Sequence, residues 1–287
     1  MANPMRPDDL ADPFREPRIG RVTATNGLTP HMQRVTIAAE CWADMPERRN
    51  GAHIRITLPA HGQGEADFAD QLSSPWAGSL SRTYSVRQHR PDLGEVDIDF
   101  VLHGEKGFAA NWARTATRGD AIGFGRPGSR KIAGITGDWY LLAADMSAIP
   151  AACAALEDLP RDAVGTAVFE IAGPDDRQPV EAPQGIEIQW IVTPDRHAAS
   201  ARQLAALREM TWRSGDPAVF VAGESGAMKA LRQFLTVEKG LERRAMYLSA
   251  YWTLGLSEGY HRWLKRIERA RARFASGSPD WRATLTG

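Results

Sequence analysis

The chain has 287 residues, of which 43% are hydrophobic, and 35 lysines and arginines balance 35 aspartates and glutamates. This length is enough for two modest domains, and the zero net charge gives no indication of nucleic-acid binding. The two cysteines, Cys41 and Cys153, match neither a metal-binding spacing nor a secreted disulfide scaffold. With no signal peptide and no membrane span in the sequence, we expect a cytoplasmic protein.

The first half of the chain predicts a small antiparallel barrel. It contains short segments that are bounded by turn-forming residues and have the length and composition of strands. The predicted strands are residues 20–25, 32–38, 53–58, 81–87, 95–102 and 120–124. Short strands at such spacing favour a barrel. A helix is predicted at 108–116, and the segment 59–80, rich in Gly, Ser and Ala, is predicted to be a long loop.

The second half of the chain predicts a different architecture. The predicted strands are residues 139–144, 166–171, 186–192, 218–222 and 245–251, and the predicted helices are 149–159, 199–209, 227–237 and 257–274. Apolar strands alternating with helices indicate a parallel sheet covered on both faces. We therefore expect a two-domain α+β protein: a six-stranded antiparallel β-barrel in residues 1–135, followed by an α/β parallel-sheet domain in residues 136–287.

Residues 81–87 read Ser-Arg-Thr-Tyr-Ser-Val-Arg and carry the strongest chemical signal. Alternate side chains of a strand share a face, so Arg82 and Tyr84 point one way and Thr83 and Ser85 the other. An arginine can clamp a phosphate, a tyrosine can lie against a flat ring, and a serine can hydrogen-bond a ring heteroatom. A flavin dinucleotide needs all three. The alternative interpretation is a half-buried strand with ordinary surface arginines.

Four segments, in the same order, resemble the siderophore-interacting protein family of ferric-siderophore reductases, within the wider ferredoxin–NADP reductase-like group. They are residues 81–87, 96–104 with 107–113, 140–150, and 222–224 through Arg232 to 251–255. The resemblance spans roughly residues 17–259. It implies an FAD-binding barrel and a domain that binds NADH or NADPH. Electrons would pass to Fe(III) in a ferric siderophore, the small-molecule substrate of a protein that we expect to be monomeric.

The resemblance also implies which residues bind FAD. Arg82 would pair with the pyrophosphate, Tyr84 would contact the ribityl chain or ring, and Ser85 would lie at the redox-active edge; Tyr84 and Ser85 are the expected catalytic residues. The other implied contacts are Thr83, Asp99, Val101, Leu102, His103, Gly107, Phe108 and Ala109. Residues 107–109 open a predicted helix, whose backbone N–H groups favour a phosphate. A plain helix cap, and a solvated histidine at 103, are the alternatives.

Nicotinamide contacts are expected at the carboxyl ends of the parallel strands, where ligands of open α/β sheets bind. The candidates are Asp145, Ser147, Ala148, Glu224 and Trp252. Glu224 could instead cap a helix, and Trp252 could be ordinary aromatic packing. The family usually has a Gly-Asp-Glu-Thr-Ala stretch, from which Ala144 and Met146 depart here.

Two further features bear on the nucleotide. Arg196 or Arg202 could bind a 2′-phosphate, so the choice between NADH and NADPH stays open. Residues 123–128 match G-x-G-x-x-G, but no helical pattern follows them, and we expect a turn rather than a dinucleotide fingerprint.

A cationic substrate site is implied at Arg55 and, more weakly, at Arg130, because catecholate siderophores are anionic. Relatives often have a basic residue where Thr253 stands, which favours a less charged siderophore such as a hydroxamate. Two other functions remain open. One is a flavin reductase that serves a protein or quinone acceptor, with the arginine-rich C-terminal helix as docking surface. The other is a non-catalytic module that binds flavin or siderophore. We expect no metal site of the protein's own, no nucleic-acid partner and no membrane partner.

Overall fold

The computed structural model describes residues 17–45, 49–60, 62–73, 81–102, 107–130, 136–195 and 199–255. His103 and the helix predicted at 257–274 lie outside these ranges. Contacts divide the chain into a large unit, Met1–Tyr251, and a C-terminal unit, Trp252–Gly287, of which residues 252–255 are described. No helix among the described residues is long and apolar enough to cross a membrane.

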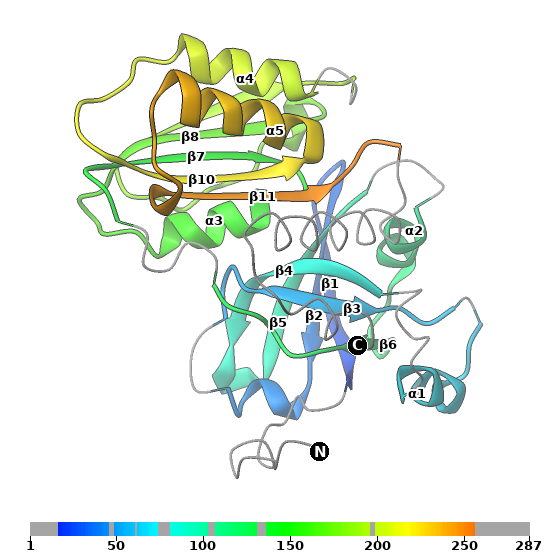
Figure 1. The fold of residues 1–287 in the computed structure, drawn as a ribbon. Helices are drawn as coiled ribbons and strands as arrows, with labels where there is room; N and C mark the ends of the chain where they lie inside the picture. Colours follow the sequence, from blue (N-terminus) through cyan, green and yellow to red (C-terminus); the bar gives the residue numbers. More distant parts are fainter. Residues whose placement is uncertain are drawn as a thin grey trace, which may run out of the picture. The chain divides into compact units, whose positions relative to one another are not determined.

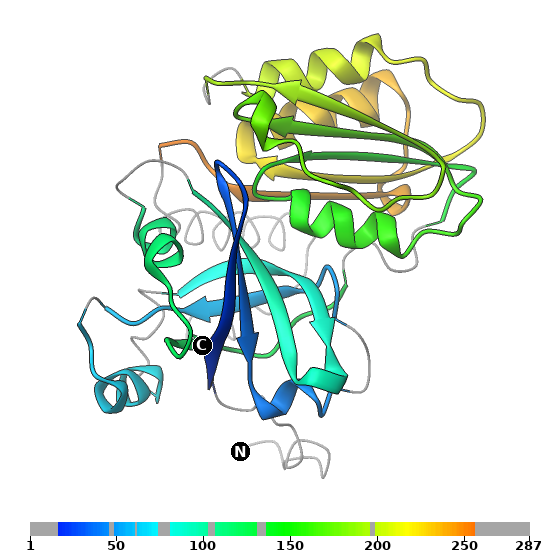
Figure 2. The same cartoon turned by 180° about the vertical axis from the view of Figure 1, so that it is seen from behind.

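The first half of the chain folds into a closed barrel (Figures 1 and 2). Its strands are β1 (Arg18–Thr29), β2 (Met32–Ala38), β3 (His53–Thr57), β4 (Ser81–Arg90), β5 (Glu95–Val101) and β6 (Ala121–Phe124), in the order β1-β2-β5-β4-β3-β6. Each neighbouring pair of strands in this order is antiparallel. Alternate side chains, among them Val86, Ile98 and Phe100, fill the interior. One helix, α2 (Phe108–Thr115), follows β5 and packs Ala113 into the same core.

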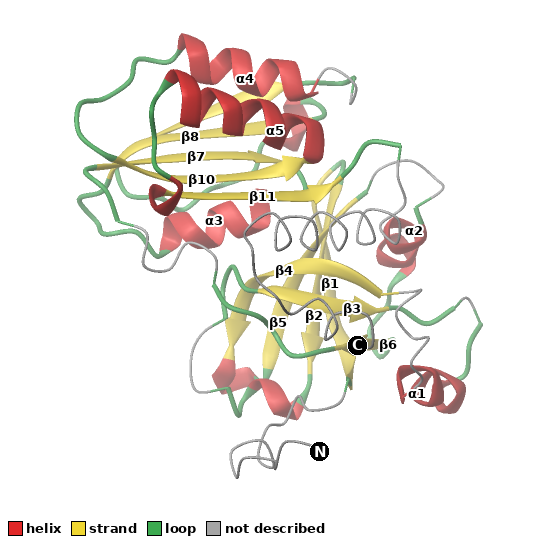
Figure 3. Cartoon of the chain, in the orientation of Figure 1, coloured by secondary structure: helices red, strands yellow, loops and turns green. Residues whose placement is uncertain are grey.

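The prediction of a loop at 59–80 is wrong in part, because this segment contains the helix α1 (Glu65–Ser73; Figure 3). Only Phe68 and Leu72, one turn apart, are buried, and two apolar residues are too few to reveal a helical period in the sequence. Leu72 also explains a glycine of β6. A Cβ built on Gly123 would lie 2.5 Å from the Cδ2 atom of Leu72, so the missing side chain makes room for the helix.

The second half of the chain forms a five-stranded sheet in the order β11-β10-β7-β8-β9. Its elements are β7 (Trp139–Asp145), α3 (Ile149–Glu157), β8 (Val164–Ile171), β9 (Gly185–Val192), α4 (Ala199–Glu209), β10 (Pro217–Glu224), α5 (Ser225–Gln233) and β11 (Met246–Trp252). The pairs β10–β7, β7–β8 and β8–β9 are parallel. Helix α3 covers one face, whereas α4 and α5 cover the other (Figure 1). The predicted fold class is thus confirmed.

Strand alternation explains how β7 supplies both cores of this domain. Leu142 and Ala144 pack in the cluster that holds the residues of α3, and Leu141 and Ala143 pack in the cluster that holds Leu207 of α4. Because both faces are covered, the strand reads as a continuous apolar run. The G-x-G-x-x-G match at 123–128 begins in β6 and continues as irregular chain, with no helix before residue 131. As expected, it lacks the helix that a dinucleotide fingerprint requires.

Candidate functional site

The motif strand β4 presents one face to the barrel. Val86 is fully buried, and the ring of Tyr84 lies 4.5 Å from that of Phe100 (centroid to centroid), which in turn lies 5.6 Å from Trp112 of α2. Arg82, two residues before Tyr84, is partly buried, and its Nη1 atom donates to the carbonyl of Ser81. The alternation predicted from the sequence therefore brings Arg82 and Tyr84 to one face, with Tyr84 in an aromatic row that reaches α2.

The opposite face of β4 meets the parallel-sheet domain. Thr83 is exposed, but Ser85 is only 6% exposed and its side chain lies close to the hydroxyl of Tyr251 on β11. The hydroxyl groups of Tyr251 and Tyr247 also lie close together. Burial of these hydroxyls raises the pKa of Tyr251, and likewise the pKa of Tyr247, so both stay protonated at neutral pH. The hydroxyl groups of Ser85, Tyr251 and Tyr247 thus gather where β4 meets the sheet.

On β5, Asp99 has a partner that sequence reasoning missed. Its side chain is 1% exposed and accepts two hydrogen bonds from Arg34 of β2, Nε to Oδ1 at 2.7 Å and Nη2 to Oδ2 at 2.9 Å. The two residues are direct partners in the β2–β5 register. The Asp99 carboxylate is therefore already bound by a residue of the neighbouring strand. This ion pair could be predicted from the sequence only if it were known that β2 pairs with β5.

The start of α2 lies close to the aromatic row. Leu102, Phe108 and Ala109 are partly buried against the barrel core, as is Tyr84; Val101, at the end of β5, is partly buried as well. Gly107 is the N-cap residue and has no side chain to accept from the N–H groups of the first turn. The first intrahelical bond runs from the N–H of Asn111 to the carbonyl of Gly107, at 2.8 Å. First-turn N–H groups and the positive end of the helix dipole suit a diphosphate here.

The carboxyl end of the parallel sheet holds the predicted nucleotide residues. Asp145 ends β7, and its Oδ1 atom accepts from the N–H (2.9 Å) and the hydroxyl of Ser147. Gly223 of β10 makes room for this carboxylate, because a Cβ there would lie 2.6 Å from its Oδ2 atom. Asp145 and Ser147 are partly buried, whereas Ala148 is fully buried and offers no side-chain surface to a ligand.

The two other nucleotide candidates differ in what the structure shows of them. Glu224 is 8% exposed, and its Oε2 atom accepts from the N–H of Ala227 at 3.0 Å. That contact is the helix cap that was the alternative interpretation of this residue, now seen at the start of α5. Trp252 is partly buried and belongs to the C-terminal unit.

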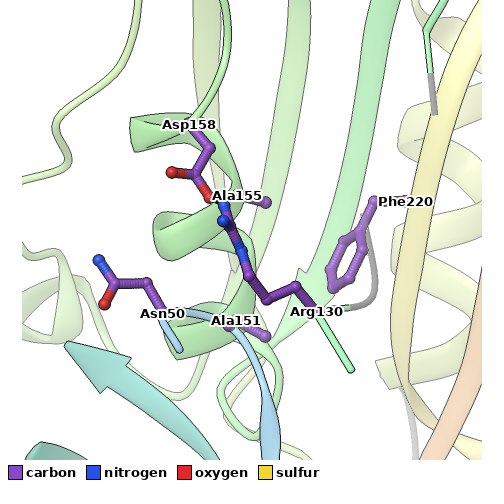
Figure 4. A pocket seen from close by; sticks show the side chains of 7 residues that line it. Asn50, Arg130, Ala151, Ala155, Asp158 and Phe220 are labelled. Carbon is purple, nitrogen blue, oxygen red and sulfur yellow. Dashed lines mark hydrogen bonds and ion pairs between the residues drawn. The ribbon is translucent and has the colours of Figure 1, made fainter. Parts of the chain in front are cut away.

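The two substrate candidates also differ. Arg55 is exposed on β3 and pairs in register with Thr83, so both lie on the outer face of the motif strand. Arg130 instead forms an ion pair with Asp158 at the end of α3, in a recess lined by Asn50, Gly51, Ala151, Ala155 and Phe220 (Figure 4). The recess holds about 10 Å³, roughly one water molecule. Arg130 is therefore already paired, and this recess is too small for a siderophore.

Comparison with known proteins agrees with these features. A family model described as "Siderophore-interacting FAD-binding domain" matches residues 21–131, and one described as "Siderophore-interacting protein" matches residues 137–255. The ferric vibriobactin reductase ViuB of Vibrio cholerae is 31% identical over 252 residues, which cover 85% of this chain and 93% of that protein.

Solved structures extend the likeness to the fold. The siderophore-interacting protein SipS from Aeromonas hydrophila aligns with a TM-score of 0.74 and 27% identity over 88% of this chain and 98% of that one. A ferredoxin–NADP⁺ reductase from Plasmodium falciparum aligns with a TM-score of 0.60 at 11% identity, covering 82% and 96% of the two chains. At that identity the second likeness concerns the fold alone.

Proposed function

Because the chain belongs to the siderophore-interacting protein family, we propose that it is an FAD-dependent reductase that passes electrons from NADH or NADPH to Fe(III) in a ferric siderophore. The observation that carries this proposal is the position of β4. One face of the strand carries Arg82 and Tyr84, and the Tyr84 ring packs against Phe100, which in turn packs against Trp112 of α2. On the other face, Ser85 lies close to Tyr251 of the parallel sheet. A flavin on this strand would lie next to the edge of the parallel sheet where the nucleotide is expected to bind.

The residues at the barrel fit FAD. The uncapped first turn of α2 would hold the pyrophosphate, with Arg82 as its counter-charge. Tyr84 would lie against the ribityl chain or ring, and the Ser85 hydroxyl would donate to or accept from the ring edge. When bound, the flavin supplies two-electron chemistry towards a nicotinamide and one-electron chemistry towards iron. The chain itself binds and orients the flavin and excludes water from it.

The iron belongs to the substrate. Siderophore oxygen ligands are hard and prefer Fe(III), so reduction weakens the complex and releases Fe(II). The exposed guanidinium of Arg55, beside Thr83 on the outer face of the motif strand, would attract an anionic ferric complex. Arg130 would first have to leave Asp158, which makes Arg55 the stronger candidate.

An anaerobic titration tests the proposal. The full chain is reconstituted with FAD and titrated with NADH and with NADPH, and a ferric siderophore is then added with a chelator that traps Fe(II). We expect the flavin absorbance to bleach with one or both nucleotides, and to return as the Fe(II)–chelator complex forms. No FAD binding would contradict the flavin site, and binding without bleaching would reduce the protein to a flavin-binding module. Bleaching that a ferric siderophore does not reverse would point to another acceptor.

A further inference from the structure

The ends of β7, β8 and β9 bring polar residues to one face of the sheet. Asp145 is the last residue of β7 and pairs in register with Glu170, the penultimate residue of β8. Both continue the alternation of Ala143 and Val168, which pack in the core cluster under α4. Thr193 follows β9 two residues after Ile191, which packs against that cluster. All three side chains therefore point to the α4 face.

Helix α4 covers this group with a further polar side chain. Leu207 is buried in the same cluster, and Gln203, one turn earlier, is 1% exposed on the same side of the helix. The neighbouring Arg202 donates from Nη1 to the carbonyl of Val192, the last residue of β9, at 3.0 Å. This contact holds the first turns of α4 beside the carboxyl end of the sheet. Gln203 thus faces the strand ends that carry Glu170 and Thr193.

These residues leave three buried polar atoms without a hydrogen-bond partner: Oε1 of Glu170, Oγ1 of Thr193 and Nε2 of Gln203. Glu170 and Thr193 are only 4% and 5% exposed. The Thr193 hydroxyl is near enough to favour the charged form of Glu170, but it is not within hydrogen-bond geometry of a partner. Buried polar atoms are normally satisfied, so unpartnered atoms from three adjoining elements indicate a group that binds here.

The position of Glu170 indicates what that group is. In parallel nucleotide-binding sheets, a carboxylate that follows the first strand by about 20 residues accepts hydrogen bonds from the ribose hydroxyls of NAD. Glu170 ends the second strand of this domain, β8, which lies directly beside the first, β7. A ribose diol offers hydroxyl donors to Glu170 and Thr193 and an acceptor to Gln203. A 2′-phosphate would instead meet the carboxylates of Glu170 and Asp145.

We propose that Glu170 determines coenzyme choice by binding the adenosine ribose hydroxyls of NADH, with Thr193 and Gln203 completing the site, so that the protein prefers NADH to NADPH. The inference rests on the proposed function only in assuming that a nicotinamide nucleotide binds the sheet. Arg202, the residue that could instead bind a 2′-phosphate, donates a hydrogen bond to the Val192 carbonyl and lies near the opposite charge of Glu170.

Binding of nucleotide fragments tests this without any turnover. The FAD-reconstituted full chain is titrated calorimetrically with ADP-ribose and with 2′-phospho-ADP-ribose at about pH 8, where the Glu170 carboxyl is ionised. We expect ADP-ribose to bind at least about tenfold more tightly. Glu170→Gln should reduce that ratio about tenfold or more, mainly through weaker ADP-ribose binding. Glu187→Gln, at an exposed position near the amino end of β9, is the matched control and should keep the ratio.

Several results would overturn the inference. They are tighter binding of the 2′-phosphate by the unmodified protein, an equal effect of Glu170→Gln on both ligands, or binding of neither ligand. Should Glu170→Gln fail to fold, Thr193→Val undergoes the same titrations and should weaken ADP-ribose selectively. If the protein binds ADP-ribose selectively but does not reduce ferric siderophores, the proposed function is contradicted and this inference stands.

Discussion

At the residue scale, Arg82 is the side chain on which FAD affinity should depend most, because it is a cation on the same face of β4 as Tyr84, where the proposed function places FAD. A charge-assisted hydrogen bond to phosphate contributes about 1.5–3 kcal/mol, so Arg82→Ala should weaken FAD binding about tenfold to a hundredfold. Fluorescence titration of the flavin-free protein measures this. Arg213→Ala, at an exposed position, should leave FAD affinity unchanged. Equal affinities for the two variants would remove Arg82 from the site.

Because the pKa of Glu170 is raised in the folded protein, we also expect stability to depend on pH. Burial, more than the opposing effect of Thr193, raises its pKa to about 7, and the nearby Asp145 charge adds to this. In the unfolded chain the carboxyl ionises near its ordinary value, so between about pH 4.5 and 7 the folded state retains a proton that the unfolded state has lost. The contribution of this group to stability therefore falls as pH rises through that window and is constant above it.

Replacing the Glu170 carboxyl should remove its contribution to the pH dependence of the free energy of unfolding. Across the window, the free energy of unfolding of the unmodified protein should fall relative to Glu170→Gln by up to about 3 kcal/mol. Urea unfolding of both proteins at a series of pH values measures the difference. Glu187→Gln, at an exposed position, should keep the slope of the unmodified protein. Parallel curves for the unmodified protein and Glu170→Gln would show that Glu170 ionises normally in the folded state.

At the element scale, the first turn of α2 should act as an anion site. Ala109 lies in this turn, so Ala109→Asp places a negative charge where the pyrophosphate is expected. The carboxylate would favour the helix N-terminus by about 0.3–1 kcal/mol but repel FAD, so the helix should persist while FAD affinity falls. Flavin titration and circular dichroism measure the two effects. Ala205→Asp, exposed on α4, introduces the same charge elsewhere and should not change FAD affinity.

At the scale of the whole molecule, ion pairs join the barrel to the parallel-sheet domain around α3. Arg87 and Arg130 pair with Glu157 and Asp158, the last residue and the C-cap of α3. Carboxylates at a helix C-terminus face the negative end of the dipole, so these arginines offset an unfavourable local arrangement. The helix is thereby tied to β4, the strand that carries the flavin motif.

Asp176 makes a second such connection and carries a prediction. Its buried carboxylate accepts from the hydroxyl of Thr29 (2.9 Å), from the backbone N–H (3.1 Å) and Nδ1 (2.8 Å) of His31, and from the N–H of Gly173 (2.9 Å). Asp176→Ala leaves these donors without their acceptor and should lower the free energy of unfolding by about 2–4 kcal/mol. Urea unfolding measures the loss, and hydrogen exchange should become faster at the amides of His31 and Gly173.

The adjacent residue supplies the control for this prediction. Asp175 is exposed, and Asp175→Ala should change stability by less than about 0.5 kcal/mol. A similar loss for both variants would mean that the carboxylate of Asp176 does not hold the β1–β2 hairpin.

The sequence by itself determined what depends on neighbours along the chain. Strand alternation assigned Arg82 and Tyr84 to one face and Thr83 and Ser85 to the other, and the change of period after residue 138 separated the barrel from the parallel sheet. Both signals arise because side-chain direction follows the local backbone period. Helix α1 was not predicted, because its two buried residues are too few to show a helical period.

Only the tertiary structure decided which distant groups meet. Arg34 pairs with Asp99, Arg130 pairs with Asp158, and Ser85 lies close to Tyr251, in each case across separate elements. Strand order and domain packing, rather than local pattern, create such contacts, and they determine which charges remain available to a ligand. Glu170 shows the same limit. In the sequence it is one acid near a strand end, and only the fold shows that it is buried beside Asp145 and Thr193.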